Sequence, residues 1–181
     1  MALLLESGLH AETWIDLDAL FVDPKRIEPN LAALTALIGQ HDVTAICGPL
    51  LGGAFVAQAI ASRLGLRFFF TERVRSSEKG ALYQAVYRLP HAQRGHIAGE
   101  RVAVVDDVIS AGSSVRATVA ELEAAGASVH VVGALLLLGN KAADHFSTRQ
   151  TPVVAPATRA FEMWEPAHCP HCQAGKPLQI P

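Results

Sequence analysis

The segment from Arg101 to Val115 reads RVAVVDDVISAGSSV, and it constrains the fold more than any other part of the chain. Its first five residues form a short apolar run rich in β-branched side chains, which is typical of a strand buried on both faces. Two carboxylates, Asp106 and Asp107, stand where this strand is expected to end. A loop of small residues follows, and the apolar spacing beyond it predicts a helix that ends at Gly126.

The loop after the acidic pair is suited to binding a phosphate group. It consists of Ser110, Ala111, Gly112, Ser113 and Ser114. Backbone N–H groups and the positive end of the helix dipole attract anions at a helix start, and the hydroxyl groups add hydrogen-bond donors. The neighbouring carboxylates would repel an anion, so they require a cation or sugar hydroxyl groups as partners. A ligand with phosphate, vicinal hydroxyl groups and Mg²⁺ satisfies all these requirements. A simple helix cap would need only one Asp, directly before the helix.

The sequence VVDDVISAGSS resembles the 5-phosphoribosyl-1-pyrophosphate (PRPP) motif of type I phosphoribosyltransferases, in which two acids among apolar residues precede T-T-G-x-S/T. The resemblance implies an α/β fold with helices on both faces of a mostly parallel twisted sheet, plus a small hood built from the termini. It implies transfer of the 5-phosphoribosyl group from PRPP to a nitrogen base, with release of pyrophosphate. Asp106 and Asp107 would then bind the ribose hydroxyl groups or Mg²⁺, directly or through water, and residues 110–114 would bind the 5-phosphate.

A glycine-rich turn precedes this motif by one strand–helix unit. Gly52 and Gly53 lie between an expected strand, Val43–Cys47, and an expected helix, Ala54–Leu64. Glycines at such a turn allow positive φ angles and a close approach of the backbone to an anion. In the family this turn holds the pyrophosphate.

The segment Thr71–Leu89 reads as a hairpin with a polar tip. By resemblance, Arg73 makes a fixed contact to pyrophosphate, and Lys79 or Arg75 makes a mobile one from a loop, Val74–Gly80, that closes over the site. Arg73 and Lys79 join the acidic pair as the expected catalytic residues. A solvated, charged hairpin tip is the alternative for Arg75 and Lys79.

The acceptor base is expected to contact Glu6, Ser7 and Asn140. The stretch Leu5–Asp16 resembles the hood of orotate phosphoribosyltransferases in its Ser-Gly turn, its aromatic residue and its Asp. Glu6, however, replaces a Lys that contacts orotate in many members, and Asn140 stands near the place of an orotate-binding Arg. We therefore expect poor use of orotate or a preference for an uncharged base. A purine-type phosphoribosyltransferase and a non-enzymatic PRPP-sensing regulator are the alternative functions.

The C-terminal segment contains Cys169 and Cys172 with two interleaved histidines, a spacing that suggests zinc. A structural zinc site normally has four ligands in two pairs, and the chain has one pair. The segment resembles the ending W-x-P-x-x-C-P-x-C-x-x-G-x-P-L of a bacterial subgroup of orotate-phosphoribosyltransferase-like proteins, which implies a tail packed on the hood. The alternatives to a tail that only packs on the hood are a zinc ion bound by Cys169 and Cys172 or, less readily, a disulfide between them.

Other patterns predict a helix over Pro29–Ile38, a buried strand over Val129–Leu138, an edge strand at Val153–Val154 and a half-buried strand over Thr13–Leu17. We expect one phosphoribosyltransferase domain over residues 1–181, with a core of about 29–150 and a hood and tail from 1–28 and 151–181.

The composition of the chain argues against some classes of partner. The chain of 181 residues is 50% hydrophobic with a net charge of −2, so nothing favours nucleic acid or an anionic membrane as partner. The three cysteines and the lack of a secretory signal predict a cytoplasmic location. We also expect a homodimer.

Overall fold

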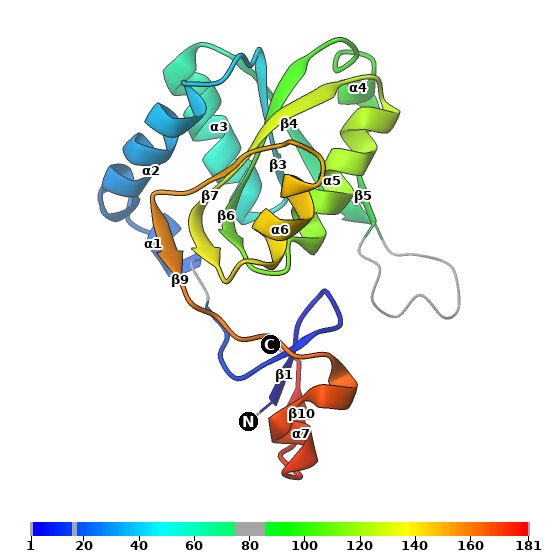
Figure 1. Cartoon of the computed structure of the whole chain (residues 1–181). Coiled ribbons are helices and arrows are strands. Elements are labelled where there is room, and N and C mark those ends of the chain that lie inside the picture. Colours follow the sequence, from blue (N-terminus) through cyan, green and yellow to red (C-terminus); the bar gives the residue numbers. More distant parts are fainter. Residues whose placement is uncertain (1, 16–17, 75–85, 181) are drawn as a thin grey trace.

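The computed structural model describes residues 2–15, 18–74 and 86–180 (Figure 1). Nearly all of the expected mobile loop, including Arg75 and Lys79, falls outside these residues. None of the helices in the described ranges combines the length and the hydropathy needed to cross a membrane.

Seven strands from the described residues form the main sheet, in the order β5-β4-β3-β6-β7-β8, with β9 also paired to β7. Their bounds are β3 (Ala45–Pro49), β4 (Arg67–Val74), β5 (Val86–Arg88), β6 (Arg101–Ile109), β7 (Ser128–Leu138), β8 (Val153–Val154) and β9 (Ala157–Arg159). The pairs are parallel, apart from the antiparallel β4–β5 hairpin. This mostly parallel α/β sheet, its edge strand β8 and the hairpin confirm the expected architecture.

Helices cover both faces of the sheet (Figure 1). On one face lie α2 (Pro24–Ile38), preceded by the short α1 (Asp18–Phe21), and α3 (Gly52–Leu64); on the other lie α5 (Ser113–Ala124) and α6 (Lys141–Ser147), with the short α4 (His91–Arg94) near α5. Along β6, Val102 and Val104 pack in the core under α5, whereas Ala103 and Val105 pack in the core under α2 and α3. The strand is therefore buried on both faces, as its apolar run predicts.

Strand β6 is longer than predicted, because its partner continues. The prediction ended the strand at Val105, but Val108 pairs with Leu136 and Ile109 with Leu137 of β7. The acidic pair consequently lies within a hydrogen-bonded strand and not in the loop after it. Helix α2 also begins earlier than predicted, because Asp23 accepts a hydrogen bond from the Lys25 N–H and Pro24 occupies the first turn.

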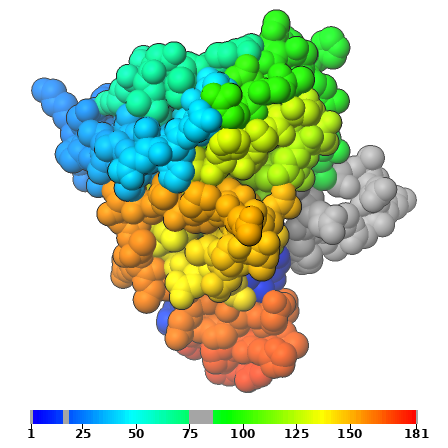
Figure 2. All heavy atoms as spheres, turned by 45° about the horizontal axis from the view of Figure 1, so that its top comes forward, coloured from blue at the N-terminus to red at the C-terminus, as the bar shows by residue number. Residues whose placement is uncertain are grey.

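A small second sheet unites the two ends of the chain, in the order β10-β1-β2. It is formed by β1 (Ala2–Leu4), β2 (His10–Ala11) and β10 (Leu178–Gln179), with η1 (Pro166–His168) and α7 (Pro170–Gln173) beside it. We call this unit the hood; it projects below the main sheet in Figure 1, and its C-terminal part projects below the core in Figure 2. The tail thus packs on the hood as expected, whereas β8 and β9 of the segment 151–181 belong to the main sheet.

The strand expected over Thr13–Leu17 is wrong for its described residues. Thr13, Trp14 and Ile15 have irregular backbone, and the hood strand β2 lies a few residues earlier. The position of β2 is set by its partners. His10 exchanges two backbone hydrogen bonds with Trp164, at 2.8 and 2.9 Å, and pairs with Leu4 of β1.

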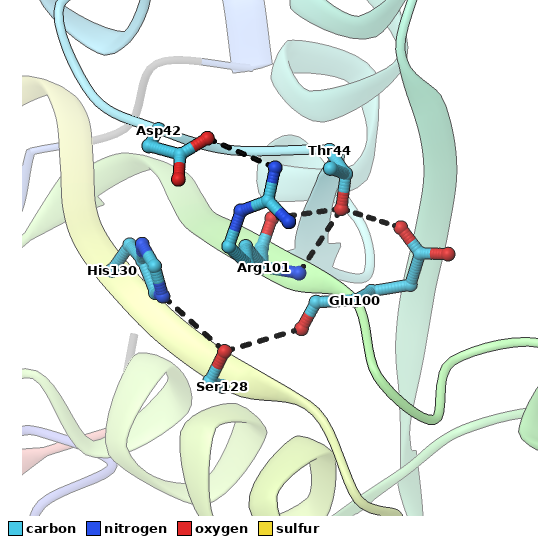
Figure 3. Close-up of polar contacts among 6 residues, drawn as sticks. All are labelled: Asp42, Thr44, Glu100, Arg101, Ser128 and His130. Carbon is cyan, nitrogen blue, oxygen red and sulfur yellow. Dashed lines mark hydrogen bonds and ion pairs between the residues drawn. The ribbon is translucent and has the colours of Figure 1, made fainter.

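A polar network joins the amino ends of the central strands (Figure 3). The Thr44 hydroxyl lies 2.6 Å from a carboxylate oxygen of Glu100 and accepts from the Arg101 N–H at 3.0 Å. The Arg101 guanidinium donates to Asp42 at 2.9 Å, and the Ser128 hydroxyl lies 3.3 Å from the His130 ring. These bonds align β3, β6 and β7 at the end of the sheet opposite the acidic pair.

Glu121 attaches helix α5 to the neighbouring segment 88–94. Its carboxylate is 3% exposed and accepts from Arg94, from Arg88 at 3.0 Å and from the Leu89 N–H at 3.2 Å. Burial alone would raise the pKa of Glu121, but the hydrogen bonds from Arg94 and Leu89 and the nearby positive charges outweigh it and lower that pKa.

We expect Glu121→Gln to lower the free energy of unfolding at neutral pH by about 1–3 kcal/mol, because charge-assisted hydrogen bonds are lost in a buried place. The folded-state pKa lies below the unfolded one, so this contribution is present above about pH 4.3 and disappears as the pH falls through the folded value. Urea unfolding at a series of pH values measures it. Glu123→Gln is the control, since Glu123 pairs with Arg149 on the surface of the same helix and should cost at most about 1 kcal/mol. Equal losses in both variants would contradict this account.

Candidate active site

A cavity of about 360 Å³ lies at the carboxyl ends of β3 and β6, next to the hood. The crossover after β3 leads to β4 on one side, while the crossover after β6 leads to β7 on the other. Ligands of open parallel sheets bind where the strand order divides in this way. The cavity is lined by Leu5, Glu6, Trp14, Ile15, Pro49, Leu50, Leu51, Gly52, Tyr87, Asp106, Asp107, Val108, Ser110, Ser114, Leu138 and Phe161.

The acidic pair forms one wall of this cavity. Asp106 is 6% exposed; its carboxylate accepts from the Ser114 hydroxyl at 2.9 Å and from the Asp107 N–H at 3.0 Å. Asp107 is half-buried, and one of its carboxylate oxygens accepts from the Val108 N–H at 2.8 Å. Burial, and then the negative charge of Asp107, raises the pKa of Asp106 well above its usual value. Oxygen donors of this kind suit a hard cation or sugar hydroxyl groups.

Glycines allow the β3–α3 turn to approach the acidic pair. A Cβ at Gly52 would lie 2.5 Å from the Asp107 carboxylate, and one at Gly53 would lie 2.6 Å from Asp106 Oδ1. A Cβ at Gly48 would lie 2.1 Å from the Gly53 carbonyl oxygen. The expectation of positive φ angles at Gly52 and Gly53 is wrong, because both residues already belong to helix α3. Their role is close packing, and Gly52 lines the cavity while Gly53 supports Asp106.

The loop of residues 110–114, which we call the phosphate-type loop, leads into α5 as predicted. Ser110 and Ser114 face the cavity, and Ser113 is the first residue of the helix. Gly112 precedes it with φ of 78°, a left-handed conformation that favours glycine. Ala111 is buried against Leu5 and Leu9 of the hood, so the loop and the hood share one apolar contact.

Glu6 of the hood is tied to the main sheet at the cavity. It accepts from the Tyr87 hydroxyl at 3.3 Å, and Arg73 Nε lies 3.9 Å from its carboxylate. Burial and the negative charges of Glu6 and Asp106 raise the pKa of Tyr87 above its usual value, so this hydroxyl keeps its proton and donates the hydrogen bond to Glu6. Arg73 was expected to contact an anionic ligand; it is exposed at the end of β4 and is paired with Glu6 in this structure.

The hood end of the cavity is apolar and partly aromatic, which the sequence interpretation missed. Leu5, Trp14, Ile15, Leu138 and Phe161 line it. These residues come from four separate segments. Leu5, Trp14 and Ile15 lie in the stretch that resembles the hood motif, whereas Leu138 and Phe161 belong to no motif. Their apolar character and the aromatic rings of Trp14 and Phe161 were the available signals.

Two expected base contacts are placed elsewhere. Asn140 is exposed before α6 and Ser7 accepts from the Leu9 N–H at 3.4 Å; neither is among the described residues that line the cavity. Strand β7 ends at Leu138, which lines the cavity, and Asn140 follows two residues later at the start of α6.

Comparison with known proteins agrees with this architecture. The Phosphoribosyl transferase domain family matches residues 25–163. The orotate phosphoribosyltransferase of Heliobacterium modesticaldum is 33% identical over 98% of this chain and 86% of its own length, and that of Thermotoga maritima is 28% identical over 98% and 88%.

Solved structures share the fold. The orotate phosphoribosyltransferase of Aeropyrum pernix superposes with a TM-score of 0.66 and 23% identity, covering 87% of this chain and 85% of that one. The adenine phosphoribosyltransferase of Thermoanaerobacter pseudethanolicus has a TM-score of 0.64 and 18% identity, covering 81% and 88%.

A mostly parallel α/β sheet, with an acidic pair beside a hydroxyl-rich helix start at its carboxyl edge, is typical of α/β proteins that bind a phosphorylated ligand. The chain belongs to the phosphoribosyl transferase domain family and is a phosphoribosyltransferase. A non-enzymatic regulator is therefore not supported.

We expect Asp106→Asn to raise the free energy of unfolding at neutral pH by about 0.5–2 kcal/mol, because it removes a buried charge next to Asp107 while Ser114 keeps a hydrogen-bond partner. The folded-state pKa is raised, so the unfolded chain loses its proton first and wild-type stability falls as pH rises from about 4. The gain should shrink on acidification, when both states are protonated.

Urea unfolding between acid and neutral pH measures this difference. Asp42→Asn is the control: Asp42 is on the surface and bonded to Arg101, so its replacement should change stability by less than about 1 kcal/mol. A destabilised Asp106→Asn protein would show that the carboxylate is needed by the fold and not only by the site.

Proposed function

We propose that the enzyme transfers the 5-phosphoribosyl group of Mg²⁺-PRPP to a nitrogen base and releases pyrophosphate, with the reaction in the cavity between the acidic pair and the hood. The observation that carries the proposal is the juxtaposition of Asp106 and Asp107 with Ser110, Ser114 and the start of α5 on one cavity wall. The helix start and its hydroxyl groups would bind the 5-phosphate. The carboxylates would bind the ribose hydroxyl groups, with Mg²⁺ alongside.

The carboxylate oxygens of Asp106 and Asp107 fit Mg²⁺, which prefers oxygen ligands and neutralises a leaving pyrophosphate when bound. The chain's own contribution is positional. Asp107, next to Gly52, would orient the ribose beside the β3–α3 turn, and the backbone of that turn would face the pyrophosphate. Arg73 would leave Glu6 and bind the pyrophosphate, while the hood excludes water that would otherwise hydrolyse PRPP. Lys79, outside the described residues, stays a predicted mobile contact.

We expect Gly52→Ala to weaken PRPP binding at least roughly tenfold, about 1.4 kcal/mol, with little change in stability. The three atoms nearest to the new Cβ all belong to the Asp107 carboxylate, with Cγ at 2.5 Å, so the Cβ would displace that carboxylate. Titration calorimetry with PRPP and Mg²⁺ measures the affinity, and urea unfolding checks the fold.

Gly95→Ala is the matched control, because its φ is −73° and a Cβ there meets nothing within 4 Å. It should bind PRPP as the wild type does. Unchanged affinity in Gly52→Ala, and also in a variant carrying both Asp106→Asn and Asp107→Asn, would contradict a PRPP site at this wall.

For the acceptor, we propose a planar base without a carboxylate. The hood end of the cavity offers apolar contacts and the rings of Trp14 and Phe161, with the Glu6 carboxylate as a hydrogen-bond acceptor. An N–H group of a base would satisfy Glu6, whereas the carboxylate of orotate would face a like charge. Arg73 shields this charge only until it binds pyrophosphate.

Orotate is the second candidate, and a different observation favours it. The relatives from Heliobacterium modesticaldum and Thermotoga maritima that match nearly the whole chain are orotate phosphoribosyltransferases. A purine is favoured only by the likeness to adenine phosphoribosyltransferase structures, at 18% identity.

Steady-state kinetics with orotate, uracil, adenine, guanine and hypoxanthine under identical PRPP and Mg²⁺ separates these candidates. We expect orotate to be a poor acceptor, and Glu6→Gln to improve orotate relative to the uncharged bases by roughly tenfold, because one repulsive charge is removed. Glu12→Gln is the control, since Glu12 is an exposed hood carboxylate outside this cavity.

Micromolar affinity for orotate that Glu6→Gln leaves unchanged would identify orotate as the acceptor and refute the role given to Glu6. Lack of turnover with every base would contradict the reaction for this panel.

A cytoplasmic location and a homodimer also stay predictions. The exposed apolar side chains of Leu51 and Phe55 near the start of α3 support a subunit contact there.

A further inference from the structure

Three side chains with metal-binding atoms meet in the hood, away from the cavity just described. The ligand atoms of His10, Cys169 and Cys172 all lie within 4.8 Å of one another. The Cys172 sulfur is 3.2 Å from His10 Nδ1. His10 is 5% exposed and Cys169 is fully buried, and both cysteines are free thiols.

The cluster joins the two ends of the chain. His10 lies in β2 and is fixed by its paired backbone hydrogen bonds to Trp164, while Cys169 directly precedes α7 and Cys172 lies within it. Sequence interpretation found one Cys-x-x-Cys pair and no second pair, because the third ligand is more than 150 residues away along the chain. In the folded chain, His10 adds a third possible ligand to the two cysteines.

We propose that His10, Cys169 and Cys172 bind one Zn²⁺ ion that clamps the N-terminal strand of the hood to the C-terminal tail. Two sulfurs and an imidazole nitrogen are soft and intermediate donors, a set that selects zinc over magnesium or calcium. The remaining tetrahedral position is left to water or a small ligand. The other tail histidines are placed differently, because His168 is exposed and His171 Nδ1 lies 2.9 Å from Lys176 Nζ.

The role of the ion is structural and separate from phosphoribosyl transfer. The hood core is small, with Leu5, Leu9 and Ala11 buried against Ala111. A unit of this size gains a large part of its stability from a bound metal, because the ion binds the folded form and not the separated chain ends. Loss of zinc should therefore loosen β1, β2 and β10 while the main sheet stays intact.

The test uses the full chain produced with zinc and dialysed without strong chelator. We expect elemental analysis to find roughly one zinc per chain, the stoichiometry of a single site. His10→Ala, Cys169→Ala and Cys172→Ala should each lose most of it. Cobalt substitution should give visible bands of a tetrahedral site and a sulfur-to-cobalt charge-transfer band that weakens in the cysteine variants.

Matched controls are His168→Ala, the exposed histidine next to Cys169, and Cys47→Ala, a buried cysteine in the main core. Both should retain zinc. His10→Cys guards against simple unfolding of the hood, because a three-sulfur site should still bind the metal. Hydrogen exchange should then show faster exchange of the hood strands in the chelated protein, with the exchange of β6 unchanged.

A wild-type protein without zinc or a cobalt spectrum would overturn the proposal, as would a Cys169–Cys172 disulfide in its place. So would zinc that persists in all three alanine variants, or zinc lost equally from the controls. These results are independent of PRPP binding, so the metal site and the proposed reaction can fail separately.

Discussion

The structure depends on keeping two adjacent carboxylates together at the carboxyl edge of a buried strand. Burial and the neighbouring charge make the ionised form of Asp106 unfavourable, and the Ser114 hydroxyl and the Asp107 N–H compensate only in part. The β3–α3 turn must also pass next to them, which only residues without a Cβ can do at positions 48, 52 and 53. A ligand with hydroxyl groups and a cation would relieve this local cost, which is why the arrangement indicates a binding site.

The rest of the domain supplies the stability that this edge lacks. Two apolar cores, one on each face, hold β6 from Val102 to Val105. Glu121 joins α5 to the β5–α4 segment, and the network around Thr44 and Arg101 fixes the strands at the opposite end. These polar contacts away from the cavity offset the cost of the two adjacent carboxylates in it.

The parts of the site that could be predicted from sequence are those whose residues are consecutive. Asp106, Asp107 and Ser114 belong to one strand–loop–helix unit, so their spacing in the sequence was sufficient to predict that they lie close together. The end of β6 could not be predicted, because β7 decides it through pairing. Tyr87, Phe161 and His10 were missed since each meets its partners only through tertiary packing. The positive φ angles predicted for Gly52 and Gly53 were wrong. A glycine can be needed either for a positive φ angle in a turn or for a close contact, and the sequence alone does not distinguish these two reasons.

Glu6 links the hood to the main sheet at the cavity. Glu6 reaches Tyr87 and Arg73 of the sheet, while its neighbour Leu5 packs on Ala111 of the phosphate-type loop. Under the proposed reaction, pyrophosphate and Glu6 compete for Arg73. Once the anion holds Arg73, the Glu6 carboxylate keeps the hydrogen bond from Tyr87 but loses its positive partner, and an N–H group on the entering base would be a further donor to it. Binding of the first substrate would thereby set the charge that selects the second.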